Sequence, residues 1–147
     1  MRRVVLAAAA GAAVLSAAPM VSAGMAPQAA ASVASPAVQA MNVALAQQGD
    51  AYAYGATGPD AFDCSGLVQF AYGQVGIALP RTSGAQAGVG TPVNADQLQP
   101  GDLVFAYGGG HVGIYTGAGQ YVYAPTEGDV VKVGPVPYGE VTALRRI

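Results

Sequence analysis

The chain has few of the residue types from which disulfide frameworks and metal sites are built. Its 147 residues include one cysteine, one histidine and no tryptophan, and only 10% are charged. A single cysteine excludes a disulfide within the chain. One cysteine and one histidine supply too few ligands for zinc unless scattered carboxylates are recruited, so we expect no metal and no other cofactor.

Basic side chains are also scarce. The whole chain has 6 Lys and Arg against 8 Asp and Glu. Arg2 and Arg3 lie in a segment that we expect to be removed, which leaves four basic and eight acidic residues and a net charge near −4 (4 − 8). With no basic patch to bind phosphates, nucleic acid and anionic lipid are not expected as partners.

The apolar stretch near the N-terminus is too short to span a bilayer. After the basic Met1-Arg2-Arg3, the apolar run covers residues 4–18, fewer than the roughly 20 residues of a spanning helix. Small residues at Val21-Ser22-Ala23 suit a signal peptidase. We therefore predict a signal peptide over residues 1–23 and an exported protein, secreted or associated with the cell wall, with no integral membrane segment after cleavage. A membrane anchor is the alternative.

The remaining chain predicts one α+β domain. Residues 24–36 are rich in Ala, Ser and Pro and read as a mobile leader before a domain over residues 37–147. Helical patterns cover residues 37–48 and begin again at Asp63. Five short apolar runs bounded by Gly, Pro or Asp then follow, at residues 103–106, 112–115, 121–124, 130–133 and 141–144. They indicate a mostly antiparallel sheet of about five strands, with the N-terminal helices packed on it.

Cys64 is predicted at the first turn of the second helix, directly after Asp63 as N-cap. Free backbone N–H groups and the positive end of the helix dipole stabilise a thiolate at this position, so we expect a lowered pKa and a reactive sulfur. A small buried hydrophobe is the alternative interpretation.

His111, the only histidine, is the candidate base. It follows three glycines and begins an apolar strand in which Val112 and Ile114 face one side while His111, Gly113 and Tyr115 face the other. A Cys–His pair accounts for both isolated residues. A serine hydrolase is not supported, because the chain has no Gly-x-Ser-x-Gly elbow.

Five segments together resemble the successive motifs of the NlpC-type cell-wall peptidases. They are Tyr52-Ala53-Tyr54-Gly55, Phe62-Asp63-Cys64-Ser65-Gly66-Leu67-Val68, Leu79-Pro80-Arg81-Thr82-Ser83, Pro100-Gly101-Asp102-Leu103-Val104-Phe105 and His111-Val112-Gly113-Ile114-Tyr115. They occur in the family's order and spacing across residues 38–145. The resemblance implies a compact papain-like fold and hydrolysis of peptidoglycan stem peptides, typically between D-γ-glutamate and a diamino acid.

The resemblance also implies residue roles. Cys64 is the nucleophile that forms a thioester acyl-enzyme, His111 is its base and acid, and Tyr52 lies near the developing oxyanion. Four further residues match positions that line the substrate groove: Asp63, Ser65, Arg81 and Ser83. Asp63 as a helix cap only, and Tyr52 as core only, are the structural alternatives.

The chain departs from this family pattern at Tyr123. The family places a polar residue, most often His, twelve positions after the base to orient the imidazole, and here that position is Tyr123. A phenol can accept the imidazole N–H but carries no charge to stabilise an imidazolium. We therefore predict Tyr123 as a weaker third catalytic residue, with simple packing as the alternative. Because of this departure, a wall-binding module with little or no turnover is the alternative function. We expect a monomer.

Overall fold

The structure, a computed structural model, describes residues 33–147. The predicted signal peptide (1–23) and most of the predicted leader (24–36) lie outside the described residues, so those predictions stand as they are. Residues Ala34–Ile147 form one compact unit. Among the described residues, no helix is both long and apolar enough to cross a membrane.

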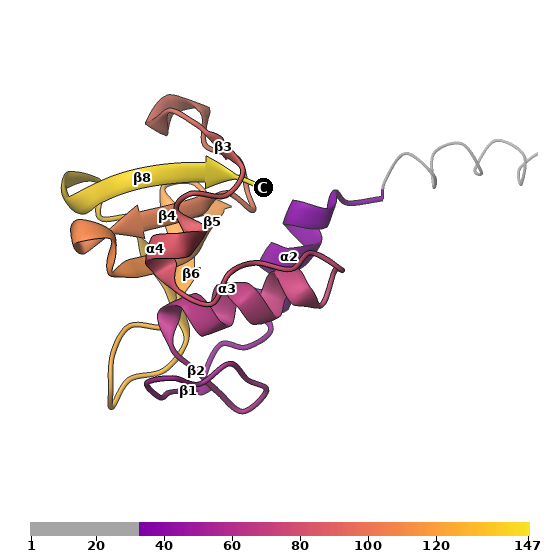
Figure 1. The fold of residues 1–147 in the computed structure, drawn as a ribbon, viewed down its shortest axis with the longest axis vertical. Coiled ribbons are helices and arrows are strands. Elements are labelled where there is room, and N and C mark those ends of the chain that lie inside the picture. The colour runs from indigo at the N-terminus through magenta and orange to yellow at the C-terminus, as the bar shows by residue number, and fades with distance from the viewer. Residues whose placement is uncertain (1–32) are drawn as a thin grey trace, which may run out of the picture. The chain divides into compact units, whose positions relative to one another are not determined.

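A six-stranded antiparallel sheet forms one layer of this unit (Figure 1). In chain order its strands are β3 (Thr91–Pro92), β4 (Leu103–Ala106), β5 (His111–Gly117), β6 (Gln120–Tyr123), β7 (Lys132–Pro135) and β8 (Val141–Arg146). Their order across the sheet is β3-β8-β4-β5-β6-β7. The α+β class and the antiparallel sheet are confirmed, but the predicted strand count of about five is one too low. The missed strand, β3, has two residues, too few to show an alternating pattern.

Two further short strands pair in parallel before the second helix. They are β1 (Ala51–Tyr52) and β2 (Ala61–Phe62). Phe62 is fully buried, and its carbonyl accepts a hydrogen bond of 3.0 Å from Ala53 N–H. This pairing holds Tyr52 at a fixed place next to the start of the helix.

The helices begin where capping side chains lie. Helix α2 (Pro36–Leu45) starts after Ser35, which accepts from Val38 N–H, and ends three residues before the predicted Gln48. Helix α3 (Cys64–Gly73) starts after Asp63, which accepts from Gly66 N–H, as predicted. The short helix α4 (Ser83–Gln86) was not predicted. Three 3-10 turns complete the regular structure, at Ala95–Gln97, Tyr107–Gly109 and Tyr138–Glu140.

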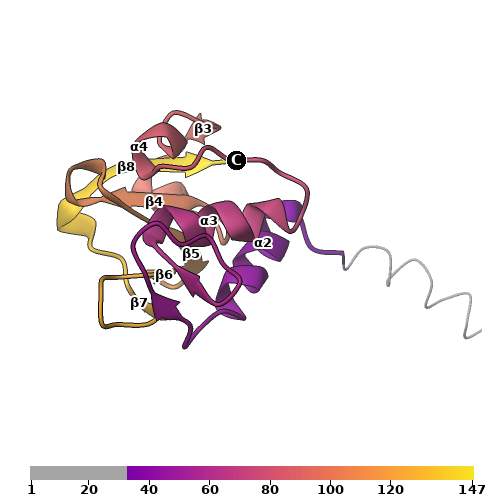
Figure 2. The same ribbon diagram turned by 60° about the horizontal axis from the view of Figure 1, so that its bottom comes forward.

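Helices α2 and α3 pack on each other and on β5, and α2 also contacts β6 (Figure 2). Between helices and sheet lies the main core, to which Leu67 and Tyr72 of α3 and Ile114 of β5 contribute fully buried side chains. A second, smaller cluster on the sheet includes Tyr115 and Tyr121. The predicted alternation along β5 is therefore confirmed. The start of this strand lies next to the start of α3, where Cys64 contacts the carbonyl of Gly110.

Candidate active site

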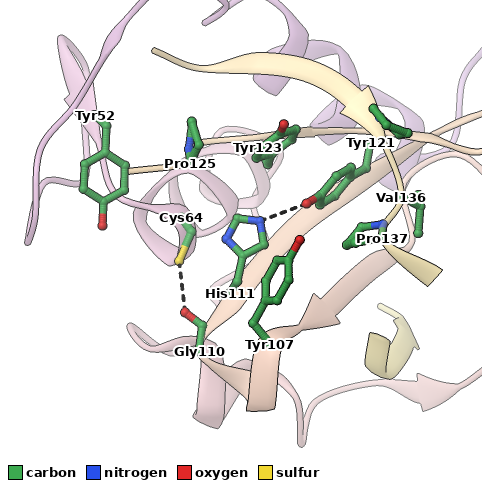
Figure 3. A pocket seen from close by; sticks show the side chains of 11 residues that line it. Tyr52, Cys64, Tyr107, Gly110, His111, Tyr121, Tyr123, Pro125, Val136 and Pro137 are labelled. Carbon is green, nitrogen blue, oxygen red and sulfur yellow. Dashed lines mark hydrogen bonds between the residues drawn. The ribbon is translucent and has the colours of Figure 1, made fainter. Parts of the chain in front are cut away.

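Cys64 is the first residue of α3 and His111 is the first residue of β5, and both line one cavity of about 520 Å³ (Figure 3). The thiol donates a hydrogen bond of 3.7 Å to the carbonyl of Gly110, the residue directly before His111. Two segments 46 residues apart in sequence therefore meet at the sulfur. The predicted pair is brought to one site.

The pKa expected for the Cys64 thiol is corrected by the structure. Burial raises the pKa of Cys64 above its ordinary value, and the negative charge of Asp63 adds to this rise. Backbone N–H groups of Val112 and Ser65 act in the opposite direction without cancelling it. Desolvation disfavours a charged sulfur more than the helix N-terminus favours it. The neutral thiol is therefore the resting form.

His111 is held by its hydrogen bond to a tyrosine. Its Nε2 lies 3.1 Å from the hydroxyl of Tyr121, and Figure 3 shows the other ring nitrogen on the side of Cys64. Burial lowers the pKa of His111 below its ordinary value. The ring is also flanked by Tyr107, at a centroid distance of 5.9 Å. A neutral imidazole with one nitrogen toward the thiol is the form that can accept its proton.

The imidazole partner differs from the one predicted. Tyr123 contacts His111 through its ring, edge to face at 5.5 Å, whereas the hydrogen-bond partner of the imidazole is the hydroxyl of Tyr121. Tyr121 lies over Gly113, where an added Cβ would overlap the tyrosine ring. Since Gly113 has no side chain, the Tyr121 side chain can extend diagonally across β5, over Gly113, to reach His111. The two tyrosine rings stack at 4.3 Å with an interplanar angle of 13°.

A second cavity, of about 350 Å³, is also lined by Cys64. It shares Tyr52, Cys64 and Gly110 with the first cavity. Its other walls contain all four predicted groove residues: Asp63, Ser65, Arg81 and Ser83. The sulfur therefore lines two cavities: the first is lined mainly by tyrosine and proline, and the second, called the polar cavity below, contains the Asp63–Arg81 ion pair.

Asp63 organises the polar cavity. Its carboxylate accepts from Gly66 N–H at 2.7 Å and from Gly55 N–H at 2.9 Å, and it forms a bidentate pair with Arg81 at 3.1 and 2.7 Å. Burial by itself raises the pKa of Asp63, but the Arg81 guanidinium and these two N–H groups hold that pKa below its usual range. Asp63 is thus both the cap of α3 and the anchor of Arg81, more than the cap-only alternative.

The other groove residues are tied to their neighbours. Ser65 is buried, donates to Asp63 at 3.3 Å and accepts from Arg81 at 2.9 Å. Ser83 donates at 2.8 Å to the carbonyl of Gly109, in the turn that leads to His111. Tyr52 lines both cavities beside the sulfur. Burial raises its pKa, as does the nearby Cys64, so its hydroxyl remains protonated.

Sequence reasoning missed Tyr121 and Tyr107. Tyr121 shares a strand face with Tyr123, so the period of two and the bare Gly113 were the signals for it. Tyr107 has a positive φ of 54° in the turn before His111, and the sequence carries no sign of this conformation. Within residues 33–147 no three His, Cys, Asp or Glu side chains gather as metal ligands would.

A cysteine at a helix start beside a histidine on an antiparallel sheet defines a papain-like α+β protein. The NlpC/P60 family model matches residues 49–142. The chain belongs to the NlpC/P60 family.

Known proteins similar to the chain carry matching names. A probable endopeptidase of Corynebacterium glutamicum is 54% identical over 85 residues, which are 57% of this chain and 41% of that protein. The chain thus spans less than half the length of this curated relative. NlpC1 from Trichomonas vaginalis superposes with a TM-score of 0.71 at 35% identity, over 78% of this chain and 45% of that one. The P60 domain of a Mycobacterium avium subspecies paratuberculosis antigen gives 0.69 at 33% identity, over 76% and 94%.

Proposed function

We propose that the protein is an exported cysteine endopeptidase that cuts peptidoglycan stem peptides at the bond between D-γ-glutamate and a diamino acid. The observation that carries this proposal is the shared cavity of Cys64 and His111, with a free thiol beside the strand that bears the only imidazole. Family membership and the endopeptidase names of relatives support the reaction class.

The proposed reaction starts from a neutral Cys64 thiol and a neutral His111 imidazole. His111 takes the Cys64 proton as the sulfur attacks the amide carbonyl, and it then gives this proton to the departing amine. The thioester formed on Cys64 is hydrolysed by water that the same imidazole activates. Tyr52 and the backbone N–H of Cys64 are the proposed donors to the oxyanion. Tyr123 belongs to this machinery through its ring, which packs on the imidazole.

The position of the acid orients the substrate. Since His111 protonates the leaving amine, the leaving side of the substrate lies in the cavity that contains His111, and the acyl side lies in the polar cavity. Arg81 is partly exposed there, and its hydrogen bonds to Asp63 and Ser65 use only part of its five N–H donors. A γ-linked glutamate keeps a free α-carboxylate, which suits this guanidinium.

Export is the second half of the proposal. A basic start, a short apolar run and Val21-Ser22-Ala23 support cleavage after Ala23 and a secreted or wall-associated location, where peptidoglycan lies. A monomer suffices for the reaction, because one chain contributes every residue named for it.

The test is mass spectrometry of muropeptides incubated with the purified protein. We expect fragments with a new amine on the diamino acid, and a loss of at least about a thousandfold in rate for Cys64→Ala, with circular dichroism unchanged. Equal release by Cys64→Ala would remove the proposal. Sedimentation with peptidoglycan without any release by the unaltered protein would instead support the wall-binding alternative.

A further inference from the structure

We propose that Tyr121 is the residue that positions the imidazole of His111 for proton transfer, and that Gly113 makes this possible. The proposal rests on the proposed function, in which His111 is the base of Cys64. It assigns the orienting role to a side chain ten positions after the histidine, two residues before the position that the family pattern indicates.

This inference rests on one contact of the His111 ring. Within residues 33–147, the hydroxyl of Tyr121 is the only side-chain group at hydrogen-bond distance from that ring. Tyr121 Oη lies 3.1 Å from Nε2, within the normal range for a hydrogen bond. The two rings stand at 90° to each other with centroids 5.9 Å apart. In Figure 3 the phenol reaches the imidazole from the side opposite Cys64. The contact fixes the ring while the other nitrogen faces the sulfur.

The direction of this hydrogen bond follows from which nitrogen of the His111 ring carries the proton. To accept the Cys64 proton, Nδ1 must keep its lone pair, so the neutral ring carries its proton on Nε2. Nε2–H then donates to the Tyr121 oxygen, and it continues to donate after Nδ1 takes the thiol proton. Tyr121 neither gains nor loses a proton in this sequence. Burial raises the pKa of Tyr121 far above neutrality, so the phenol stays uncharged throughout.

Gly113 and Tyr123 hold the phenol in place. The Tyr121 ring occupies the space over Gly113 that a Cβ would fill. The Tyr123 ring stacks on the Tyr121 ring at a centroid distance of 4.3 Å, an arrangement worth about 1 kcal/mol between aromatic rings. The hydroxyl of Tyr123 points elsewhere, toward Gly134, where an added Cβ would lie 3.0 Å from it. The ring of Tyr123 therefore serves this arrangement, whereas its hydroxyl does not reach the imidazole.

A pair of single-atom deletions tests the assignment. Tyr121→Phe keeps the ring, the stack on Tyr123 and the cover over Gly113, but removes the acceptor of Nε2–H. Tyr123→Phe removes the hydroxyl that lies away from His111. Tyr138→Phe removes a phenol hydroxyl outside both cavities and is the matched control for activity.

The first measurement is nitrogen and proton NMR of the imidazole in the full chain, where one histidine gives one set of signals. We expect a hydrogen-bonded Nε2–H, protected from exchange with water, in the unaltered protein and in Tyr123→Phe. In Tyr121→Phe we expect that signal to shift and to exchange at least about tenfold faster. An unchanged signal in Tyr121→Phe, or a loss confined to Tyr123→Phe, overturns the proposal.

The second measurement is steady-state kinetics on a stem-peptide substrate. Tyr121→Phe should lower kcat about 10- to 100-fold with KM within about twofold, because the loss falls on the orientation of the base rather than on substrate contacts. Tyr138→Phe should match the unaltered protein. A change of KM alone in Tyr121→Phe contradicts the positioning role. The NMR result does not depend on turnover, so an inactive protein with a protected Nε2–H would refute the proposed function and leave the Tyr121 contact established.

Discussion

The thiol of Cys64 and the imidazole of His111 both lie in surroundings that favour their neutral forms. Burial raises the pKa of the first group and lowers the pKa of the second. The proton therefore rests on sulfur, where it is donated to the carbonyl of Gly110. In the proposed mechanism it moves to the ring only when the sulfur attacks the substrate. This differs from a preformed thiolate–imidazolium pair, which a helix-dipole argument alone predicts.

The pH dependence of alkylation tests this resting state. Below the raised pKa of Cys64 the thiolate fraction grows tenfold per pH unit, so the rate of reaction with iodoacetamide should rise about tenfold per unit between pH 6 and pH 8. A rate that is constant over this interval would indicate an ion pair instead.

The pH profile of turnover tests the state of His111. Because the pKa of His111 is lowered from 6.5, we expect kcat/KM to fall on the acid side only below pH 6.5.

At the scale of elements, the start of α3 depends on one carboxylate. Asp63 caps the helix, accepts from the loop at Gly55 and anchors Arg81, which comes from the segment just before α4. The second residue of α3, Ser65, joins the same network. One buried side chain therefore sets the relative positions of a loop, a helix start and a cavity wall. Its loss should affect stability as well as the groove.

Asp63→Asn tests this dependence. Asparagine can still cap a helix but cannot form the ion pair, so we expect the free energy of unfolding at pH 7 to fall by about 1–3 kcal/mol. The folded pKa of Asp63 lies below its ordinary value of 3.8. Its contribution is therefore present above about pH 4 and is lost as the pH falls through the folded pKa. Denaturant titrations from pH 7 to pH 3 should show the difference between variant and unaltered protein shrinking below pH 4.

Asp129 offers a matched control for this measurement. It pairs with Lys132 three residues away in a partly exposed ion pair. Surface pairs of this kind contribute little to stability. Asp129→Asn should therefore leave the unfolding midpoint unchanged, and an equal loss in both variants would contradict a special role for Asp63.

On the scale of the whole molecule, residues Ala34–Ile147 form one compact unit, and within the described residues its two core clusters run from Ala37 to Ile147. The two clusters use both faces of the sheet, and Val33, the first described residue, is 75% exposed. Because this unit has a core of its own, we expect residues 34–147 to fold by themselves.

A chain restricted to residues 34–147 should unfold at a temperature within about 3 °C of the full chain, which for a domain of this size corresponds to less than about 1 kcal/mol. Differential scanning calorimetry of the two chains makes this comparison. A markedly lower midpoint for the shorter chain would mean that residues 1–33 contribute to the folded core.

The sequence predicted those features that rest on patterns long enough to detect. The N-cap Asp63 and the helical spacing after it located α3, and five apolar runs located five strands. Strands β1, β2 and β3 were missed because strands of two residues have no detectable period. The contact of Tyr121 with His111 was missed because alternation predicts the strand face of a side chain but not how far it extends over Gly113. The predicted lowering of the Cys64 pKa was wrong because the burial that raises it is a property of the folded chain.

The two cavities that meet at Cys64 also matter for inhibition. A compound with an electrophilic centre at this sulfur could extend into either cavity, one with a charged pair and one lined mainly by tyrosine and proline. An anionic arm would suit the side of Arg81, and an uncharged aromatic arm would suit the side of Tyr107 and Tyr121. In a compound that carries both arms on one electrophile, each arm must point toward its own cavity. An isomer with the two arms exchanged should therefore react with Cys64 far more slowly.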